Sequence, residues 1–408
     1  MRSTIVILAA CACSSAAGSG PSSAPATGTE TAAETVAVAA AVAVAAAVAE
    51  TETAAATETA AGTAAATEPA AGTAADAAGP LTLAFAGDVM FGRFVDDGFA
   101  PIEAERHDPF TTMAPLLAAA DLAFVNLETP VMAAPPATSS WGTRMRFVGT
   151  PARLATLAAA GVDVVSLANN HHYDLRAAGV AETPGHCAAS GLTVIGAAVA
   201  AEPRLRVETL TARGRRIGVV AATTTRNGDQ RPGEPLLPFA EERGLAAAVT
   251  PLLVAARADH DLVIAIMHWG TEYAEVPERW QIDAAHAFVE AGADLVIGSH
   301  PHVLQGIERY RGAVIAYSLG NFLFDNTVEL PRQTGLLRVT IDAGRCSAAR
   351  FDAALIHKYP EHHVAATPGR RGRVIRDRLR ALSAARPLRT PWRDDGDALV
   401  LDAACPPP

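Results

Sequence analysis

The sequence has few aromatic residues and few cysteines for its length, and it has no excess of basic charge. Its 408 residues include 21 aromatic side chains and five cysteines, and 33 basic residues stand against 43 acidic ones. A net charge of −10 excludes a strongly basic nucleic-acid-binding protein, so no nucleic-acid partner is expected. No run of 18 strongly apolar residues follows residue 80, which excludes a bundle of membrane-spanning helices from there on.

The shortage of aromatic and basic residues is most marked near the start of the chain. Residues 12–80 hold seven of the acids, no lysine or arginine and no aromatic residue, and they are mainly Ala, Thr, Gly, Ser, Pro, Val and Glu. Such a segment has no large side chains whose burial would offset the entropy cost of ordering. We predict a disordered tether, although the Ala/Val stretch 36–48 could form a short helix. Residues 81–408 carry 36 acids and 32 bases, enough chain for one large domain or two small ones.

The first 11 residues have the features of an export signal. Arg2 precedes a short apolar run, and Leu8-Ala9-Ala10-Cys11 resembles a bacterial lipobox, in which the cysteine is lipidated after cleavage. Cys11 is therefore the candidate lipidation site, and we expect the protein at the cell surface or in the periplasm, anchored to the membrane by lipid. Because the apolar run is short, plain secretion and an incidental apolar start stay open.

The other cysteines form no pattern. Cys13 falls in the predicted tether, and Cys187, Cys346 and Cys405 are scattered without the C-x-x-C spacing of a thiolate zinc site. The sequence thus predicts single buried thiols rather than a framework of disulfides.

Apolar runs of strand length alternate with helix-compatible segments from residue 81 onward, which is typical of an α/β fold. The predicted strands are 81–86, 122–126, 162–167, 193–195, 217–221, 262–267, 295–297 and 314–318, and the predicted helices are 111–120, 151–160, 241–256 and 278–291. Two later strands, 336–341 and 348–356, have no helix between them and indicate a second or mixed sheet. We predict a domain over 81–365 and an Arg/Pro-rich extension over 366–408, with a solvated helix and loop or a binding patch at 366–393.

The unusual polar residues lie just past the carboxyl ends of five predicted strands, where open α/β sheets place their sites. In chain order these ends carry Asp88, Glu128, Asn170 with His171, His268, and His300 with His302. Carboxylates can bridge two cations, neutral imidazoles fill further positions, and an amide oxygen suits a divalent ion that acids already neutralise. Two such ions could activate a water molecule and hold the oxyanion of a phosphoryl group. The set predicts one or two divalent metal ions.

Six motifs in sequence carry a resemblance to a known family. They read G-D-V-M from residue 87, N-L-E-T-P from 126, S-L-A-N-N-H from 166, H-W-G-T-E-Y from 268, G-S-H-P-H-V from 298 and Y-S-L-G-N-F from 317. Together they resemble the CapA family of poly-γ-glutamate capsule biosynthesis proteins, over residues 81 to about 325. The resemblance implies a fold similar to calcineurin-like metallophosphoesterases, which is a four-layer α/β/β/α sandwich of the metallo-dependent phosphatase type with a two-metal site at the strand ends.

The resemblance also implies a role for each residue of the set. Asp88 and His302 would bind the first metal ion and Glu128 would bridge the two ions, while the ligands of the second ion would be Asn170, His268 and His300. His171 would protonate the leaving group or steady the phosphoryl oxygens. Asp174 would orient His171 or, alternatively, serve only as a turn or helix cap. The ions implied are Mn, Zn, Fe or Mg.

Three positions depart from the phosphoesterase pattern. Met90 stands where an Asp-x-His motif has its histidine, and a thioether is a poor ligand for a hard divalent ion. Glu128 replaces an aspartate at the bridge, and Arg176 stands where a glycine is usual. The Met90 departure leaves open a one-metal site or a weakly active enzyme.

Substrate contacts are predicted for five further residues, each with a plainer alternative. Trp269, Tyr273 and Asn321 belong to the CapA-specific motifs and either line a substrate groove or pack beneath the loops. Arg144 and Arg146 either bind an anionic group such as a carboxylate or a phosphate, or lie in a solvated loop. The histidines that match no ligand position are interpreted as surface or structural residues: His172, His286, His357, His362 and His363.

Three functions stay open on the sequence. The first is an exported, lipid-anchored protein that acts on an anionic capsule polymer such as polyglutamate, in its synthesis, export or attachment, by metal-dependent hydrolysis. The second is a non-catalytic subunit that binds polymer, or membrane partners, in a capsule-synthesis complex. The third is a general secreted metallophosphoesterase with a phosphoester substrate.

Overall fold

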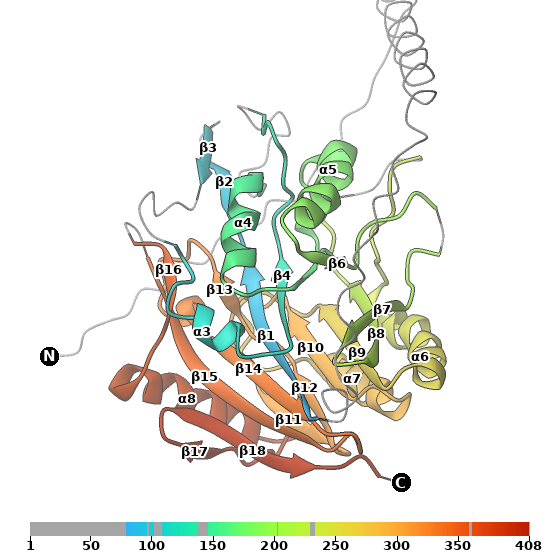
Figure 1. The fold of residues 1–408 in the computed structure, drawn as a ribbon, viewed down its shortest axis with the longest axis vertical. Coiled ribbons are helices and arrows are strands. Elements are labelled where there is room, and N and C mark those ends of the chain that lie inside the picture. Colours follow the sequence, from blue (N-terminus) through green and yellow to red (C-terminus); the bar gives the residue numbers. More distant parts are fainter. Residues whose placement is uncertain are drawn as a thin grey trace, which may run out of the picture. The chain divides into compact units, whose positions relative to one another are not determined.

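The computed structural model describes residues 79–95, 98–101, 108–136, 146–201, 203–228, 233–358 and 361–407. Predictions for the export signal, for Cys11 and for the tether up to residue 78 lie outside the described residues, and so does Arg144. Helices and strands carry the labels of Figure 1.

The larger of two main sheets has ten strands. Its path from one edge to the other is β17 (Arg393–Asp395), β18 (Ala398–Ala404), β15 (Ser347–His357), β14 (Gln333–Ile341), β1 (Leu81–Val89), β4 (Leu122–Leu127), β5 (Val164–Ser166) and β6 (Thr193–Ile195). Beside this path, β13 (Asn321–Leu323) pairs with β1, and β16 (His363–Ala366) pairs with β15. The four strands from β1 to β6 are parallel, so their carboxyl ends meet at one edge of the sheet.

The smaller sheet has six strands in the order β11 (Ile307–Tyr310), β12 (Ala313–Ala316), β10 (Leu295–Ser299), β9 (Leu262–His268), β8 (Arg215–Thr223) and β7 (Glu208–Ala212). Its four inner strands are parallel, and the two edge strands are antiparallel. A separate hairpin joins β2 (Gly92–Val95) to β3 (Gly98–Pro101).

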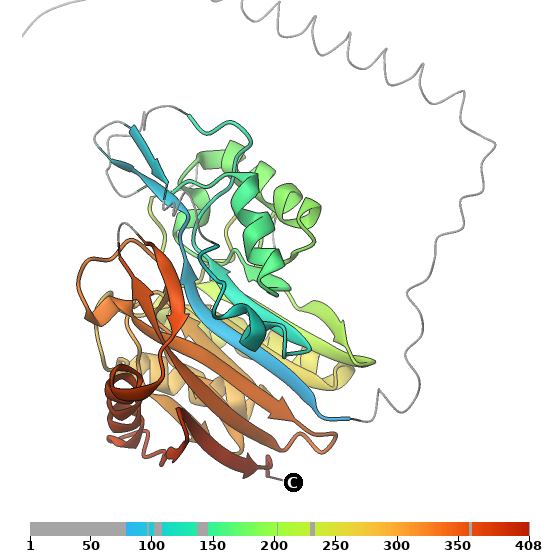
Figure 2. The ribbon, with the colours of Figure 1, turned by 60° about the vertical axis from the view of Figure 1, so that its left-hand side comes forward.

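The alternation of apolar side chains along the strands builds four layers. In β1, Leu83 and Phe85 point into a core between the two sheets, while Ala84 and Ala86 point into a core beneath the helices. That outer core is covered by α3 (Ala114–Leu117), α4 (Pro151–Ala159) and α5 (Arg176–Ala189). On the other side, α6 (Glu242–Asp259) and α7 (Arg279–Glu290) cover the smaller sheet. The predicted four-layer α/β/β/α sandwich is confirmed (Figures 1 and 2).

The C-terminal segment from Gly369 onward is part of this sandwich. β18 pairs along β15, and α8 (Gly369–Ala384) places Ile375 and Leu379 in the core between the sheets. The predicted domain end at residue 365 is therefore wrong, because removal of residues 366–408 would expose the edge of the larger sheet and part of that core. Among the described residues, no helix has both the length and the apolar character that crossing a membrane requires.

Cys346 and Cys405 form a disulfide bond, which links the turn after β14 to the end of β18. The prediction of single buried thiols was wrong for this pair. The two residues are 59 positions apart, and only the pairing of β15 with β18 brings them together. Cys187 is a buried free thiol, as predicted.

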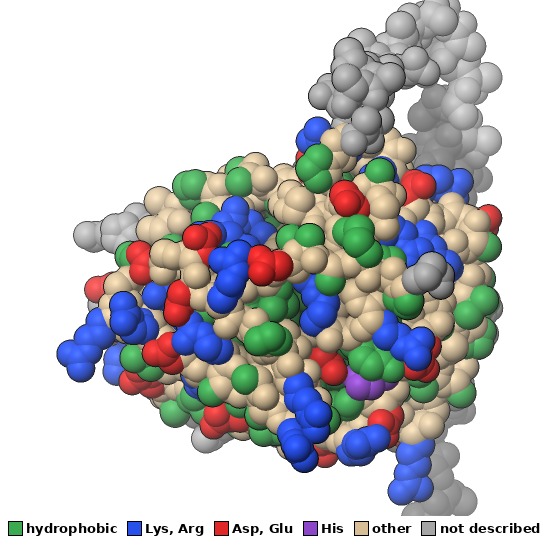
Figure 3. Space-filling view, turned by 90° about the horizontal axis from the view of Figure 1, so that it is seen from below, with side chains coloured by type: hydrophobic (Ala, Val, Ile, Leu, Met, Phe, Trp, Pro, Cys, Tyr) green, Lys and Arg blue, Asp and Glu red, His purple; other side chains and the backbone are tan. Residues whose placement is uncertain are grey.

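Charged side chains of both signs are interspersed over the face in Figure 3. Many of them pair with one another, as Arg350 does with Asp352 and Asp395. The mixing of the two signs agrees with the small net charge of residues 81–408, which carry 36 acids and 32 bases.

Candidate metal centre

Two glycines let the strands that carry the site approach neighbouring backbone closely. A Cβ atom on Gly87, in β1, would lie 1.8 Å from the carbonyl oxygen of Gly320, and one on Gly298, in β10, would lie 2.0 Å from that of Tyr317. The next residue after Gly87 uses this approach, because the Asp88 amide donates a hydrogen bond to Gly320 O at 2.9 Å. Glycine at these two positions therefore fixes where Asp88 and the loop of His300 lie.

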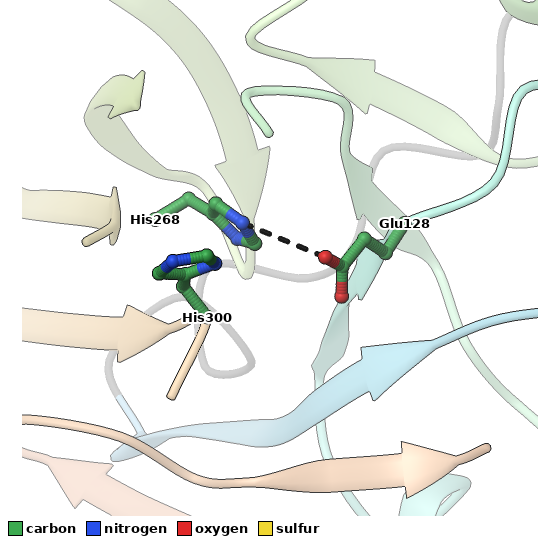
Figure 4. Close-up of side chains that lie close together, drawn as sticks. All are labelled: Glu128, His268 and His300. Atoms are coloured by element: carbon green, nitrogen blue, oxygen red, sulfur yellow. Dashed lines mark ion pairs between the residues drawn. The ribbon is translucent and has the colours of Figure 1, made fainter. Parts of the chain in front are cut away.

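All six predicted ligands lie together where the carboxyl ends of the two sheets meet. Glu128 Oε1 is 3.6 Å from His268 Nε2 and 3.9 Å from His302 Nε2, and it is 3.8 Å from His171 Nε2. Figure 4 shows Glu128 facing His268 and His300 from the opposite sheet. The ligand atoms of Asp88, Glu128 and His302 lie within 4.8 Å of one another, as do those of Glu128, His268 and His300.

The surroundings of Glu128 fit a divalent cation. Its side chain is fully buried, and neither carboxylate oxygen has a hydrogen-bond partner among the described residues. Leaving a buried carboxylate without partners costs several kcal/mol. The imidazole nitrogens stand too far from it for hydrogen bonds, but two ligands of one ion with bonds of about 2.1 Å lie roughly 3–3.5 Å apart. The two groups that share Glu128 could each hold a divalent ion, and they are called here the first position (Asp88, Glu128 and His302) and the second position (Glu128, His268 and His300).

Hydrogen bonds hold the ligands of the first position. Asp88 Oδ1 accepts from Asn126 Nδ2 at 2.8 Å, and Asp88 Oδ2 lies 3.2 Å from His302 Nδ1. The same ring nitrogen of His302 is 2.9 Å from Asn321 Oδ1. These contacts at Nδ1 turn the Nε2 atom of His302 toward Glu128.

The second position is held in a similar way. His268 Nδ1 lies 3.1 Å from Ser299 Oγ, which leaves Nε2 facing Glu128 and 2.7 Å from Asn170 Oδ1. Asn170 Nδ2 donates to Asn227 Oδ1 at 2.9 Å, so the amide presents its oxygen to the centre. An amide oxygen oriented in this way has the geometry of a ligand.

Burial and mutual charge perturb the titration of these groups. Burial raises the pKa of Glu128 well above its usual value, and the neighbouring Asp88 carboxylate adds to the rise. Burial lowers the pKa of His300 to about 3 and lowers the pKa of His268 well below its usual value, so both rings are neutral. For His302, burial lowers the pKa, but the carboxylates of Glu128 and Asp88 outweigh it and raise the pKa to about 9. Metal ions bind carboxylates and neutral imidazoles, so an ion at this centre would displace the protons that the raised pKa values favour on Glu128 and His302.

The backbone of the histidine loop is strained. His300 has a φ of 98° and His302 a φ of 57°, a region that residues with a Cβ seldom occupy. Strain of this kind costs on the order of 1–3 kcal/mol per residue and clusters at ligand clamps and active sites. Here the two strained residues are the ones whose imidazoles lie beside Glu128.

His171 has a separate set of contacts beside the centre. Its Nδ1 atom lies 2.6 Å from Asp174 Oδ2, and its ring stacks on Phe147 with centroids 3.7 Å apart. Asp174 is fully buried and also accepts from the Phe147 amide at 2.7 Å and from Asn227 Nδ2 at 3.0 Å. Asp174 therefore orients the His171 ring, whose Nε2 atom points to the centre.

Of the predicted substrate residues that the structure describes, two are fully buried and two are more exposed. Trp269 is fully buried, stacks on Phe288 and donates from Nε1 to Tyr317 O, so its packing alternative applies and the substrate interpretation is wrong. Asn321 is also fully buried and contacts His302, so it positions a ligand rather than substrate. Tyr273 is 52% exposed, with its ring 6.2 Å from that of His302. Arg146 donates to Asp174 O at 3.1 Å.

Several contacts were not predicted from the sequence. Asn227, in the loop after β8, hydrogen-bonds both Asn170 and Asp174, and a single asparagine in a polar loop gives no signal. Asn126 was part of a quoted motif, but its contacts with Asp88 and His268 were not foreseen. Met90, the departure from the Asp-x-His pattern, is fully buried in the outer core of the larger sheet.

A family model described as "Bacterial capsule synthesis protein PGA_cap" matches residues 82–326, well over half of the chain. The chain belongs to this family. The match spans every predicted ligand, from Asp88 to His302, and strand β13, which begins at Asn321. The resemblance to the CapA family is confirmed by this match together with the CapA proteins among the relatives of the chain.

Relatives of this PGA_cap chain include two Bacillus proteins. The PGA biosynthesis protein CapA of Bacillus subtilis is 30% identical over 264 residues, which is 63% of this chain and 67% of that protein. The capsule biosynthesis protein CapA of Bacillus anthracis is 30% identical over 257 residues, 60% of each chain. A probable polyglutamine synthesis accessory protein of Mycobacterium tuberculosis is 26% identical over 285 residues, which cover 60% of this chain and 74% of that one.

Proposed function

We propose that this protein acts in the synthesis, export or attachment of an anionic polymer of the poly-γ-glutamate type, by hydrolysis at a divalent metal centre. Its PGA_cap membership and the names of its Bacillus relatives support the polymer. The observation that carries the hydrolytic part is Glu128, a buried carboxylate between three histidines and Asp88 that has no hydrogen-bond partner among the described residues.

The residues of the centre suit hydrolysis of a phosphoester, acyl or amide bond. Divalent ions held by Asp88, Glu128, Asn170, His268, His300 and His302 would lower the pKa of bound water and neutralise developing negative charge. His171 can hold or release a proton at Nε2, while Asp174 keeps its Nδ1 atom occupied. Stacking on Phe147 limits rotation of the His171 ring and excludes water from one of its faces.

Export and lipid anchoring at Cys11 belong to the same proposal. The disulfide between Cys346 and Cys405 supports an oxidising compartment, because such bonds persist outside the reducing cytosol. Mass spectrometry of the mature N-terminus tests the anchor, and a diacylated Cys11 is the expected result. An unmodified chain that begins well after Cys11 would refute it.

Metal analysis tests the centre itself. We expect the purified protein to hold at least one Mn, Zn, Fe or Mg ion per chain, and Asp88→Ala and His300→Ala variants to hold less. His186→Ala is the matched control, because His186 pairs with Glu182 on the surface of α5. Equal metal content in all four proteins would refute the metal centre.

Substrate assays separate hydrolysis of polymer from other functions. We expect the metal-loaded protein to shorten poly-γ-glutamate and to lose this activity in His171→Ala. Cleavage of p-nitrophenyl phosphate without any action on polymer would instead indicate a general phosphoesterase. Polymer binding without cleavage, in a protein that holds its metal, would indicate a binding subunit of a capsule-synthesis complex.

A further inference from the structure

We infer that Glu272 is a further ligand of the metal centre and reaches it from the solvent side. The inference rests on the metal centre of the proposed function and adds a residue that the predicted ligand set does not contain. It concerns the loop between β9 and α7, which carries Glu272 at its exposed surface.

The position of Glu272 relative to the histidines supports a ligand. One carboxylate oxygen of Glu272 and one nitrogen each of His300 and His302 lie within 4.8 Å of one another. The two imidazoles are buried and Glu272 is exposed, so the three atoms mark the boundary between the centre and solvent. His300 Nδ1 is buried and has no hydrogen-bond partner in the part of the chain that the structure describes.

Glu272 comes from outside the two sheets and lies beside one histidine of each ion position, His302 of the first and His300 of the second. Asp88, Glu128 and His302 provide three ligands at the first position, and β1 provides no fourth among its described residues. Met90, two residues after Asp88, points away from the centre into the core beneath α3 and α4, where it is fully buried. Glu272 provides an additional carboxylate, a ligand type that hard divalent ions accept.

Backbone hydrogen bonds fix the loop of Glu272 over the histidines. The Trp269 amide donates to Ser299 O at 3.0 Å, and the Tyr273 amide donates to Pro301 O at 2.8 Å. These two bonds flank Glu272 and tie its loop to the strained loop of His300 and His302. Gly270 allows the turn, because it has a φ of +92° and a Cβ there would lie 2.6 Å from Gln281 Nε2. Glu272 is therefore held beside the histidines by the fold of its loop.

Exposure gives this ligand a distinct chemical property. A carboxylate at the solvent boundary can dissociate from the ion and be hydrated by water. Glu128 and Asp88 are buried, so dissociation would leave each of them as a buried charge without a partner. An anionic group of a substrate that enters from solvent would compete with Glu272 for the same ion. Glu272 is thus an exchangeable ligand at the side where substrate arrives.

Titration of the metal-free full-length protein with Mn²⁺ tests the inference. We expect Glu272→Gln to weaken one Mn²⁺ position by about tenfold or more in isothermal titration calorimetry. Glu275→Gln is the matched control, because it removes the same charge from the same loop, where Glu275 pairs with Arg378 at 3.1 Å. The control is expected to bind Mn²⁺ within about twofold of the wild type, because Glu275 belongs to none of the candidate metal groups among the described residues and the charge it removes is exposed and screened by salt.

The visible spectrum of the Co²⁺-substituted protein gives a second measurement of direct coordination. We expect Glu272→Gln to change the intensity and position of the Co²⁺ bands, and Glu275→Gln to leave them unchanged. Wild-type affinity and spectrum in Glu272→Gln would overturn the inference, and so would equal losses in both variants. A wild-type protein that binds no Mn²⁺ would instead overturn the metal centre of the proposed function.

Discussion

Trp269 and Tyr273 lie in one loop but in opposite surroundings. Trp269 is enclosed by Phe288, Trp280 and Tyr317, whereas Tyr273 is 52% exposed beside His302. The two residues were predicted together as possible substrate contacts because both belong to the H-W-G-T-E-Y motif, with packing as the alternative. The sequence shows that an aromatic residue follows His268 but not toward which side the loop turns.

This difference predicts opposite effects of alanine. Trp269→Ala should lower the free energy of unfolding by about 3–5 kcal/mol, because it leaves a large cavity in the core of the smaller sheet. Tyr273→Ala should change it by less than about 0.5 kcal/mol, since little buried surface is lost. Urea unfolding followed by circular dichroism measures both. Similar losses in the two variants would contradict the assigned surroundings.

Arg176 occupies a backbone conformation that suits glycine. Its φ is 57°, and it is the first residue of α5, directly after the loop of His171 and Asp174. Arg176, which stands where the phosphoesterase pattern has a glycine, therefore keeps a backbone conformation that glycine adopts easily. A left-handed conformation costs a residue with a Cβ about 1–2 kcal/mol.

Two substitutions separate this strain from the contacts of the arginine side chain, whose guanidinium lies over the ring of Tyr173. Arg176→Gly and Arg176→Ala both remove that contact, but only glycine relieves the strain. We expect the glycine variant to be more stable than the alanine variant by about 1 kcal/mol, as measured by thermal unfolding. Greater stability of the alanine variant, as in an ordinary helix, would contradict this expectation.

Among the elements, α8 is the one that sequence reasoning placed outside the domain. Its many arginines indicated a solvated helix, and one face of it is solvated, with Arg380 paired to Asp377 and Asp394. The other face carries Ile375 and Leu379 into the core between the sheets. Composition averages over both faces of a helix, so it concealed the apolar side of α8.

Leu379→Ala should accordingly cost about 2–5 kcal/mol of stability, whereas Val374→Ala in the same helix should be nearly neutral. Leu379 is fully buried, and Val374 is 54% exposed. Chemical unfolding of both variants gives the comparison. An equally small effect at the two positions would mean that α8 does not belong to the core.

The strands were the most predictable elements, and α5 was the least. Continuous apolar runs marked β1, β4, β9 and β10, because parallel strands covered on both faces need apolar residues throughout. α5 contains Gly179, Pro184 and Gly185, which indicate breaks in a helix when read locally. In the structure Gly179 is buried, and a Cβ atom there would lie 2.5 Å from Leu175 Cβ, so its small size serves packing. The clustering of the six candidate ligands could be predicted because they directly follow the apolar strands, whereas the contacts of Asn227 could not.

At the scale of the whole molecule, the disulfide closes the C-terminal part of the larger sheet. Cys346 and Cys405 are 59 positions apart, and the segment between them contains β15, α8 and β18. Replacing both by serine should lower the free energy of unfolding by about 2–4 kcal/mol, because the unfolded chain gains freedom. Unfolding with and without reducing agent is the measurement. A reduced wild type as stable as the oxidised one would contradict a structural role for the bond.

The six candidate ligands come from both sheets, which has a consequence for the stability of the protein. Asp88, Glu128 and Asn170 lie at strand ends of the larger sheet, and His268, His300 and His302 lie at strand ends of the smaller one. A bound ion would cross-link the two halves of the sandwich, and an ion at about 100 times its dissociation constant adds about 2.7 kcal/mol to stability. Metal supply would then set the lifetime of the protein, and metal-starved molecules would be the first that proteases remove.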